Sequence, residues 1–203
     1  MNKILMILLI LSILTTSYIF FSSTQKEKKS SEINSGSVSS KIDDIVIPVE
    51  EVTLSEAKLT IVKPKSWHKF GERSSNGYNY YFTPYKYEDL GLFKRGLSIT
   101  IIKNVSKTEK VSPNELALSY IKNSKTINPK LKITKVNIQH LKGYRFQLEE
   151  KKGFRNSMVT SFFFVSDDRN DMFYSFIFQY EKSKWNMTYP IRRTIFRNIK
   201  FLQ

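Results

Sequence analysis

The chain has 203 residues, no cysteine and a formal net charge of +15. The lack of cysteine excludes disulfides, thiolate metal sites, cysteine nucleophiles and a lipid-modified N-terminal cysteine. Hydrophobic residues make up 40% of the chain and aromatic residues 14%, too many for a disordered protein. The length therefore suits one folded domain with an N-terminal appendage.

The positive charge lies in the C-terminal part of the chain. Residues 1–56 hold five lysines and seven acids, a net charge of −2, which leaves +17 for residues 57–203. Such an excess attracts phosphate, anionic lipid, acidic polymers or an acidic partner. A solvated basic face without a ligand is the alternative interpretation, because Lys, Asn, Ile, Phe and Tyr are all abundant, as an AT-rich coding sequence produces.

An uncharged apolar segment opens the chain. Ile4 to Phe21 covers 18 residues, which as a helix measure roughly 27 Å, close to the roughly 30 Å of a bilayer core. Residues 1–21 are predicted to be a membrane anchor, with a cleaved signal peptide as the alternative, since Lys3 precedes an apolar core and small residues follow it. In either case the domain is expected on the extracytoplasmic side, membrane-anchored in the first interpretation and secreted in the second.

A linker separates this segment from the globular part. Residues 22–44 are rich in Ser, Lys, Glu, Asn and Gly, a composition that cannot form a core, and Ile45–Val52 is predicted to be an extended lead-in. The flexible part would span roughly 25 Å. These patterns predict three parts: an anchor or signal peptide at 1–21, a linker at 22–56 and a globular domain at 57–203.

The first half of the domain is predicted to hold three strands and a helix. The strands are Ala57–Val62, Gly77–Phe82 and Leu97–Val105, with Pro64 and Pro84 expected to end the first two. Ser112-Pro113-Asn114-Glu115 is a capping box with proline at the first helical position, so a helix begins there. The face predicted to be apolar consists of Leu116, Ala117, Tyr120 and Ile121.

The second half is predicted to be a meander followed by a helix. Its strands are about Leu131–Gln139, Gly143–Glu150, Ser157–Val165 and Met172–Tyr180. Phe162 and Phe164 are expected to pair with Tyr174, Phe176 and Phe178 across the last hairpin. An amphipathic helix at Ser183–Arg197, bent by Pro190, and a short closing strand at Ile199–Phe201 complete an α+β domain with an antiparallel sheet.

This order of elements resembles the PsbP-like family, which includes bacterial DcrB-type envelope proteins. The matching features are Pro64-Lys65-Ser66-Trp67 after the opening strand, the helix from Ser112 to Lys125 after the third strand, and the exit Ile195–Phe201 of the last helix. The resemblance covers residues 57–203. It implies an α/β/α sandwich with a central, mainly antiparallel sheet, and a small exported binding or assembly protein attached to a membrane. No match exists to the metal-ligand histidines proposed in plant members, so metal binding and photosystem association are not implied.

Enzymatic chemistry is not expected. His68 and His140 are the only histidines and lie 72 residues apart, a separation that indicates neither a metal site nor a catalytic base. Glu149-Glu150 and Asp167-Asp168 stand beside hairpin turns, where carboxylates are usually solvated or bond to the turn. No glycine-rich phosphate loop is present, and no cofactor and no nucleic-acid partner are predicted.

Basic residues form the candidate site. If the hairpin ends of the meander lie near the last helix, the basic residues of the two would meet there and could bind phosphate, an anionic polymer or lipid, or a protein partner. The residues are Lys142, Arg145, Lys151, Lys152, Arg155, Arg192, Arg193 and Arg197, with Lys200 beside them. The predicted function is a non-enzymatic, membrane-anchored extracytoplasmic binding or assembly domain. A cleaved, secreted factor and an enzyme of unrecognised class are the alternatives.

Overall fold

The computed structural model describes residues 47–86, 95–138, 140–150 and 157–202, which belong to a compact unit at Asp43–Gln203. The predicted anchor and most of the predicted linker lie outside the described residues, as do Lys151, Lys152 and Arg155. The predicted boundaries between anchor, linker and domain therefore stay predictions.

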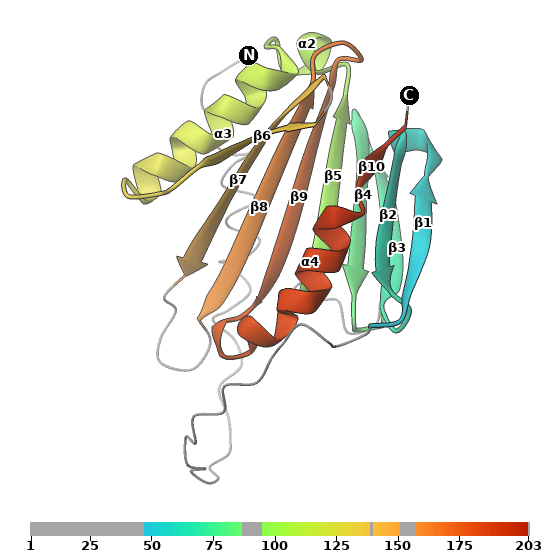
Figure 1. Ribbon diagram of the computed structural model, residues 1–203. Coiled ribbons are helices and arrows are strands. Elements are labelled where there is room, and N and C mark those ends of the chain that lie inside the picture. Colours follow the sequence, from blue (N-terminus) through green and yellow to red (C-terminus); the bar gives the residue numbers. More distant parts are fainter. Residues whose placement is uncertain (1–46, 87–94, 139, 151–156, 203) are drawn as a thin grey trace, which may run out of the picture. The chain divides into compact units, whose positions relative to one another are not determined.

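A seven-stranded sheet in which all neighbouring strands are antiparallel forms the centre of the domain (Figure 1). Its strand order is β3-β4-β5-β9-β8-β7-β6. The strands are β3 His68–Ser74, β4 Gly77–Thr83, β5 Gly96–Lys103, β6 Thr134–Ile138, β7 Leu141–Glu150, β8 Met158–Asp167 and β9 Met172–Glu181. Strands β4 and β5 and the meander were predicted, whereas β3 was not.

A second, three-stranded antiparallel sheet has the order β1-β2-β10. Its strands are β1 Val49–Leu54, β2 Leu59–Pro64 and β10 Lys200–Phe201. Strand β1 precedes the predicted start of the domain, yet it pairs along its whole length with β2, from Val49 opposite Pro64 to Leu54 opposite Leu59. Pro64 is thus the last residue of β2, and the strand lies two residues later than predicted.

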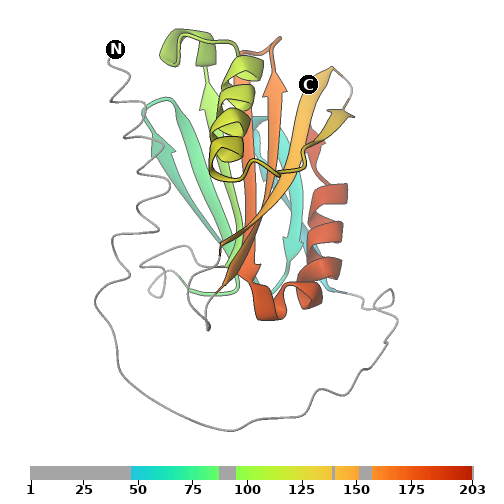
Figure 2. The ribbon, with the colours of Figure 1, turned by 90° about the vertical axis from the view of Figure 1, so that its left-hand side faces the viewer.

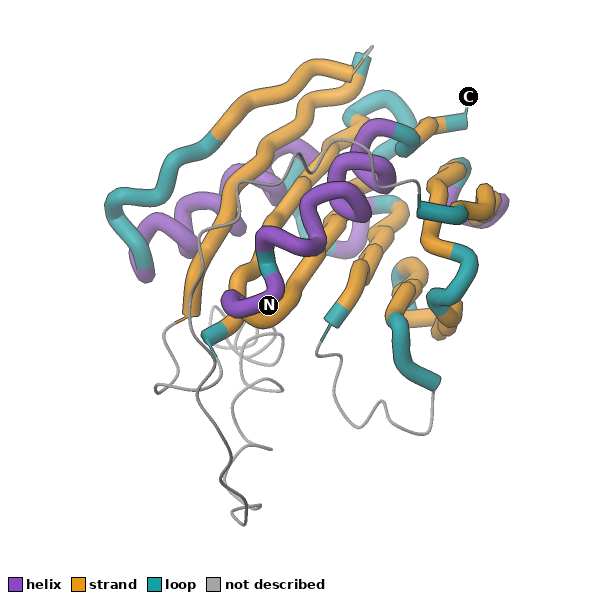
Figure 3. Tube along the Cα trace, turned by 60° about the horizontal axis from the view of Figure 1, so that its bottom comes forward, coloured by secondary structure: helices purple, strands orange, loops and turns teal. Residues whose placement is uncertain are grey.

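Helices cover both faces of the large sheet, so the domain has three layers. The helices are α2 Val105–Thr108, α3 Pro113–Ile127 and α4 Tyr189–Arg197, with short 3-10 turns η3 Ser55–Ala57, η5 Lys182–Lys184 and η6 Asn186–Thr188. Helix α3 covers one face of the large sheet, and α4 lies on the other with the small sheet beside it (Figures 2 and 3). The α+β class is confirmed, and one outer layer combines a helix with a small sheet.

Two apolar cores lie on the two faces of the large sheet. Phe163 is opposite Phe176 in the β8–β9 pair, and both face the α4 layer. Phe162 and Phe164 point the other way and pack beneath α3 with Phe173. The predicted pairing of Phe162 and Phe164 with the aromatic residues of β9 is therefore wrong by one residue. Both faces of β8 are apolar, so alternation alone does not assign them.

Helix α3 begins at the predicted capping box. The Ser112 hydroxyl accepts a hydrogen bond from the Glu115 amide at 3.2 Å, and the Glu115 carboxylate accepts one from the Ser112 amide at 2.8 Å. The same carboxylate accepts a bond from the Ser112 hydroxyl at 2.9 Å. The backbone bond from Ser112, together with the side-chain bond, lowers the pKa of Glu115.

We expect Ser112→Ala to lower the free energy of unfolding by about 1 kcal/mol at neutral pH, because an amide of the first helical turn loses its acceptor. A carboxyl whose pKa is lowered in the folded state stabilises the fold above its ordinary pKa and loses this contribution as the pH falls. Denaturant unfolding should therefore show the difference between the two proteins shrinking in acid. Ser124→Ala, which removes a bond from the Ser124 hydroxyl to the Tyr120 carbonyl, is the control and should show no such pH dependence.

Candidate functional site: the basic surface of helix α4

Helix α4 has one buried and one exposed side. Pro190 stands in its first turn, where a missing amide hydrogen costs nothing, and two 3-10 turns precede the helix. Ile195 is buried against the sheet, and Ile191 and Phe196 pack beside it. Tyr189, Arg193 and Arg197 are spaced by four residues and share the outer side.

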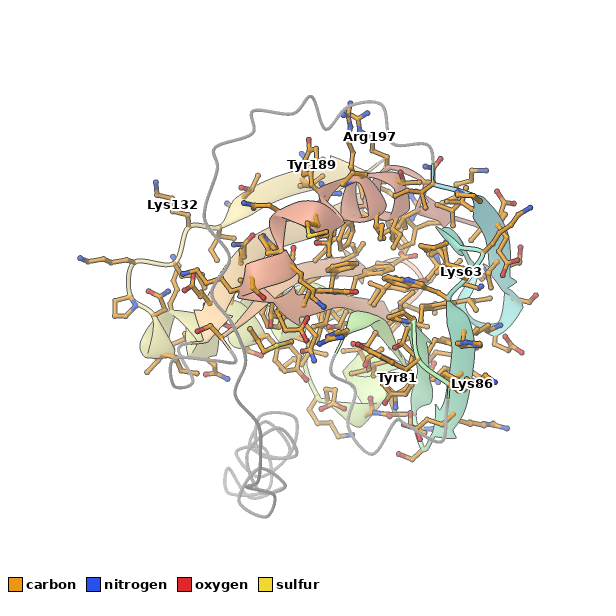
Figure 4. The ribbon with its side chains drawn as sticks, turned by 90° about the horizontal axis from the view of Figure 1, so that it is seen from below. Lys63, Tyr81, Lys86, Lys132, Tyr189 and Arg197 are labelled. Carbon is orange, nitrogen blue, oxygen red and sulfur yellow. The ribbon has the colours of Figure 1, made fainter. Side chains whose placement is uncertain are left out.

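The exposed side of this region is basic and partly apolar. Figure 4 shows Tyr189 and Arg197 on the same side of the molecule, pointing away from the sheet. Met187 is 76% exposed and Tyr189 is 46% exposed, and Lys184, Arg193 and Arg197 are exposed around them. We call these five residues the α4 surface. The sequence holds no acidic residue from 182 to 203, so no carboxylate of this segment offsets its positive charge.

Arg192 lies on the inner side of α4 and holds the helix to the turn before it. Its guanidinium carbon is 3.9 Å from the centroid of the Trp185 ring, a cation–π distance. Its Nε donates a hydrogen bond to the Thr188 hydroxyl at 3.0 Å. Burial lowers the pKa of Arg192, which nonetheless stays charged at neutral pH. Arg192 is therefore a packing residue rather than part of the α4 surface.

Arg145 joins the meander to α4. Its guanidinium carbon lies 4.4 Å from the centroid of the Phe163 ring on β8 and 5.8 Å from that of Phe196 on α4. Burial lowers the pKa of this guanidinium, and its Nε is buried with no hydrogen-bond partner among the described residues. The structure thus brings one predicted meander residue against the last helix.

Lys142 does not take part in this cluster. It lies three residues before Arg145 on β7, so the two side chains point to opposite faces of the sheet. The Lys142 ammonium binds Asp168 at 3.0 Å, and hydrogen bonding and charge from Asp168 raise its pKa. Asp168 also accepts a bond from the Asn114 amide at the start of α3. Lys142 therefore supports the α3 side of the fold.

The histidines and paired acids occupy structural positions. His68 is the first residue of β3, and His140 lies in the turn before β7 with its Nε2 3.6 Å from Asp167 Oδ1. Asp167 accepts bonds from the Arg169 and Asn170 amides at 3.1 Å, so it closes the β8–β9 turn as predicted. In the described ranges, no three His, Cys, Asp or Glu side chains are grouped so that they could hold a metal ion.

A second basic region was not singled out from the sequence. It lies at the end of α3 and in the segment that leads into β6, and we call it the α3 end. Its exposed lysines are Lys122, Lys125, Lys130, Lys132 and Lys135. No acid occurs from residue 116 to 148, so a count of charge by segment could have found it. Figure 4 shows Lys132 well apart from Arg197.

These features define the class: a small α+β domain with two antiparallel sheets and a basic, partly apolar helix surface. No protein-family model matches the chain, and no curated protein sequence matches it. Across the part of the chain that the structure describes, no helix is long and apolar enough to cross a bilayer.

Several solved structures are similar to this chain. The chain is similar to the cyanobacterial PsbP of Synechocystis, with 10% identity over 82% of this chain and 98% of that one and a TM-score of 0.47. LpqN of Mycobacterium tuberculosis, described as involved in cell envelope biogenesis, has 10% identity over 80% and 95%, with a TM-score of 0.47. A Bacteroides thetaiotaomicron protein has 12% identity over 75% of this chain, which spans only 48% of that protein, at a TM-score of 0.43. A PsbP is thus among the similar structures.

Proposed function

We propose that this protein is a non-enzymatic, membrane-anchored binding domain on the extracytoplasmic side, and that its α4 surface docks on an anionic envelope surface. The observation that carries the proposal is the combination of exposed Met187 and Tyr189 with exposed cations in a segment, 182–203, whose sequence contains no acid. Apolar and aromatic side chains beside Lys and Arg are typical of segments that lie in the headgroup region of a bilayer. An acidic protein partner is the competing occupant.

Three acids on neighbouring elements of the described chain are already paired with cations. Glu181 binds Arg95, and Glu149 binds Lys182 at 2.5 Å. On the small sheet, Glu51 binds Lys200 at 3.0 Å. These three carboxylates are therefore committed to other cations, and exposed Lys184 and Arg197 can attract an external anion.

The first described strand also belongs to the α4 layer. Strand β1 pairs with β2, which pairs with β10 directly after α4 and packs against α4 itself. A chain anchored by its predicted apolar segment and joined through a linker of roughly 25 Å would keep this layer near the bilayer. Short tethers raise the effective concentration of a weak binding surface, so modest affinity suffices for docking.

The test uses the full-length chain in lipid nanodiscs. Both tryptophans of the protein, Trp67 and Trp185, pack on Phe178, and Trp185 lies two residues before Met187. A lipid with a nitroxide on its headgroup should therefore quench their fluorescence when the α4 surface docks. We expect quenching in anionic discs and little in zwitterionic discs. Raising the salt from 0.1 M to 1 M, which shortens the Debye length from about 10 Å to about 3 Å, should relieve it.

Equal quenching in both kinds of disc, or quenching that salt does not change, would contradict electrostatic docking. Quenching that is absent throughout would favour the protein partner. N-terminal sequencing of the mature protein separates the anchored form from the secreted alternative: an intact Met1 supports the anchor, and a start near Tyr18 or Gln25 shows cleavage.

A further inference from the structure

A hollow of about 330 Å³ opens beside the C-terminal end of β1, where the η3 turn begins. Three segments build it: the η3 turn between β1 and β2, the end of β5, and the β8–β9 turn. Its volume is at the lower end of the range for small-molecule sites, so a ligand there would be small. The lining residues are Ser55, Glu56, Lys58, Lys103, Asn104, Asn170 and Met172.

The lining of the hollow holds two lysines, Lys58 and Lys103, and one acid, Glu56. Neither Lys58 nor Lys103 forms an ion pair with a carboxylate of the described residues, and the Lys103 ammonium lies 5.0 Å from the centroid of the Tyr78 ring. Glu56, the acid that lines the hollow, accepts a hydrogen bond from the Tyr80 hydroxyl at 3.3 Å. Burial, with help from Glu56, raises the pKa of Tyr80 to about 12, so this hydroxyl stays a donor.

The neighbouring Asp171 carboxylate is also occupied. It accepts bonds from the Ser106 amide at 2.9 Å and from the Ser106 hydroxyl at 2.6 Å. Both acids near the hollow thus have donors within the protein, whereas the two lysines have no acidic partner there. The Asn104 side-chain amide, which makes no capping bond to α2, adds a donor without charge.

The backbone of the hollow is held in a conformation that ordinary residues avoid. Lys58, Asn104 and Asp171 have positive φ values of 48°, 53° and 53°. Each such residue costs roughly 1–2 kcal/mol and persists only where its surroundings hold it. Here the Lys58 carbonyl accepts a bond from the Leu202 amide at 2.8 Å, and the Asp171 carbonyl accepts one from the Val105 amide at 3.2 Å. The rim is therefore fixed before any ligand arrives.

We propose that this hollow binds a phosphate group, either as free phosphate or as the phosphate of a small polar molecule. Lys58 and Lys103 supply two compact positive charges, which suit a phosphate as point charges. Asn104 and Ser55 supply neutral donors, and buried Met172 adds an apolar part to the lining. The site is separate from the α4 surface and does not depend on the docking proposed for it.

Calorimetric titration of the full-length chain in neutral detergent tests this site. The probes are inorganic phosphate and glycerol 3-phosphate, each against chloride of equal ionic strength. We expect saturable binding of at least one probe. Lys58→Gln and Lys103→Gln should each weaken binding at least about tenfold, since a hydrogen bond to a charged group contributes about 1.5 kcal/mol or more. Lys107→Gln, on neighbouring α2 but outside the hollow, makes the same change in net charge and should leave the affinity within about twofold.

The two probes separate the sources of the phosphate. Similar affinity for both means that the phosphate group alone is recognised, and tighter binding of glycerol 3-phosphate means that the hollow also accommodates the attached alcohol. Heat without saturation, or equal losses in Lys107→Gln and the two lining variants, would overturn the proposal. Thermal unfolding of each variant shows whether the fold is retained. Tryptophan quenching in anionic discs should be unchanged in Lys58→Gln, so failure of this site is distinguishable from failure of α4 docking.

Discussion

Gly77→Ala is expected to abolish folding or to lower the free energy of unfolding by more than about 4 kcal/mol, a loss that few single substitutions cause. Gly77 is the first residue of β4, and a Cβ there would lie 1.7 Å from the Ile101 carbonyl oxygen and 2.8 Å from its carbon. Both atoms are backbone in β5, so relief requires the two strands to separate. Because β4 connects β3 to the rest of the large sheet, that separation would also release β3.

Gly71→Ala is the matched control for this prediction. Its Cβ would meet Tyr80 Cδ1 at 2.8 Å, which is a side-chain atom, so relief requires a shift of one ring and no separation of strands. We expect a loss of at most about 2 kcal/mol. Denaturant unfolding monitored by the two tryptophans compares the variants directly, and similar losses at the two glycines would show that the β4–β5 backbone contact is not limiting.

Local chemistry predicted much of this fold. The Ser112 capping box placed the start of α3, and alternation placed Leu97, Ile99 and Ile101 on one buried face of β5. Strand β3 was missed because its sequence, His68–Ser74, is mostly polar and exposed, as an edge strand that faces water can be. Pairing with β4 across the tight turn at residues 75–76, not the preference of its own residues, makes it a strand.

Two features of the functional regions were not predicted from the sequence. Lys142 and Arg145 were grouped by proximity in sequence, but three residues along a strand reverse the face, so strand parity could have separated them. The hollow could not be found in this way. Its lining comes from turns near residues 56, 104 and 171, and its positive-φ residues are not glycines, so no local pattern indicates the conformation or the assembly.

Reversing two charges on the α4 surface should release the domain from an anionic membrane. Arg193→Glu with Arg197→Glu removes two cations and adds two anions on the outer side of α4. Each Lys or Arg near an anionic bilayer contributes about 1 kcal/mol, so loss of the two cations alone lowers the ratio of docked to undocked protein about 30-fold, and the new anions lower it further. The measurement is headgroup quenching of tryptophan in anionic nanodiscs at low salt.

Lys130→Glu with Lys132→Glu gives the same change in net charge at the α3 end, on the opposite layer of the domain. If the α4 surface docks, this variant keeps most of the quenching, because its altered charges face away from the bilayer and are screened over about 10 Å. Equal loss in the two variants would mean that net charge alone drives association. Loss in the lysine variant only would assign docking to the α3 end. A position-specific response at Arg193 and Arg197 is what separates a docking surface from a merely basic protein.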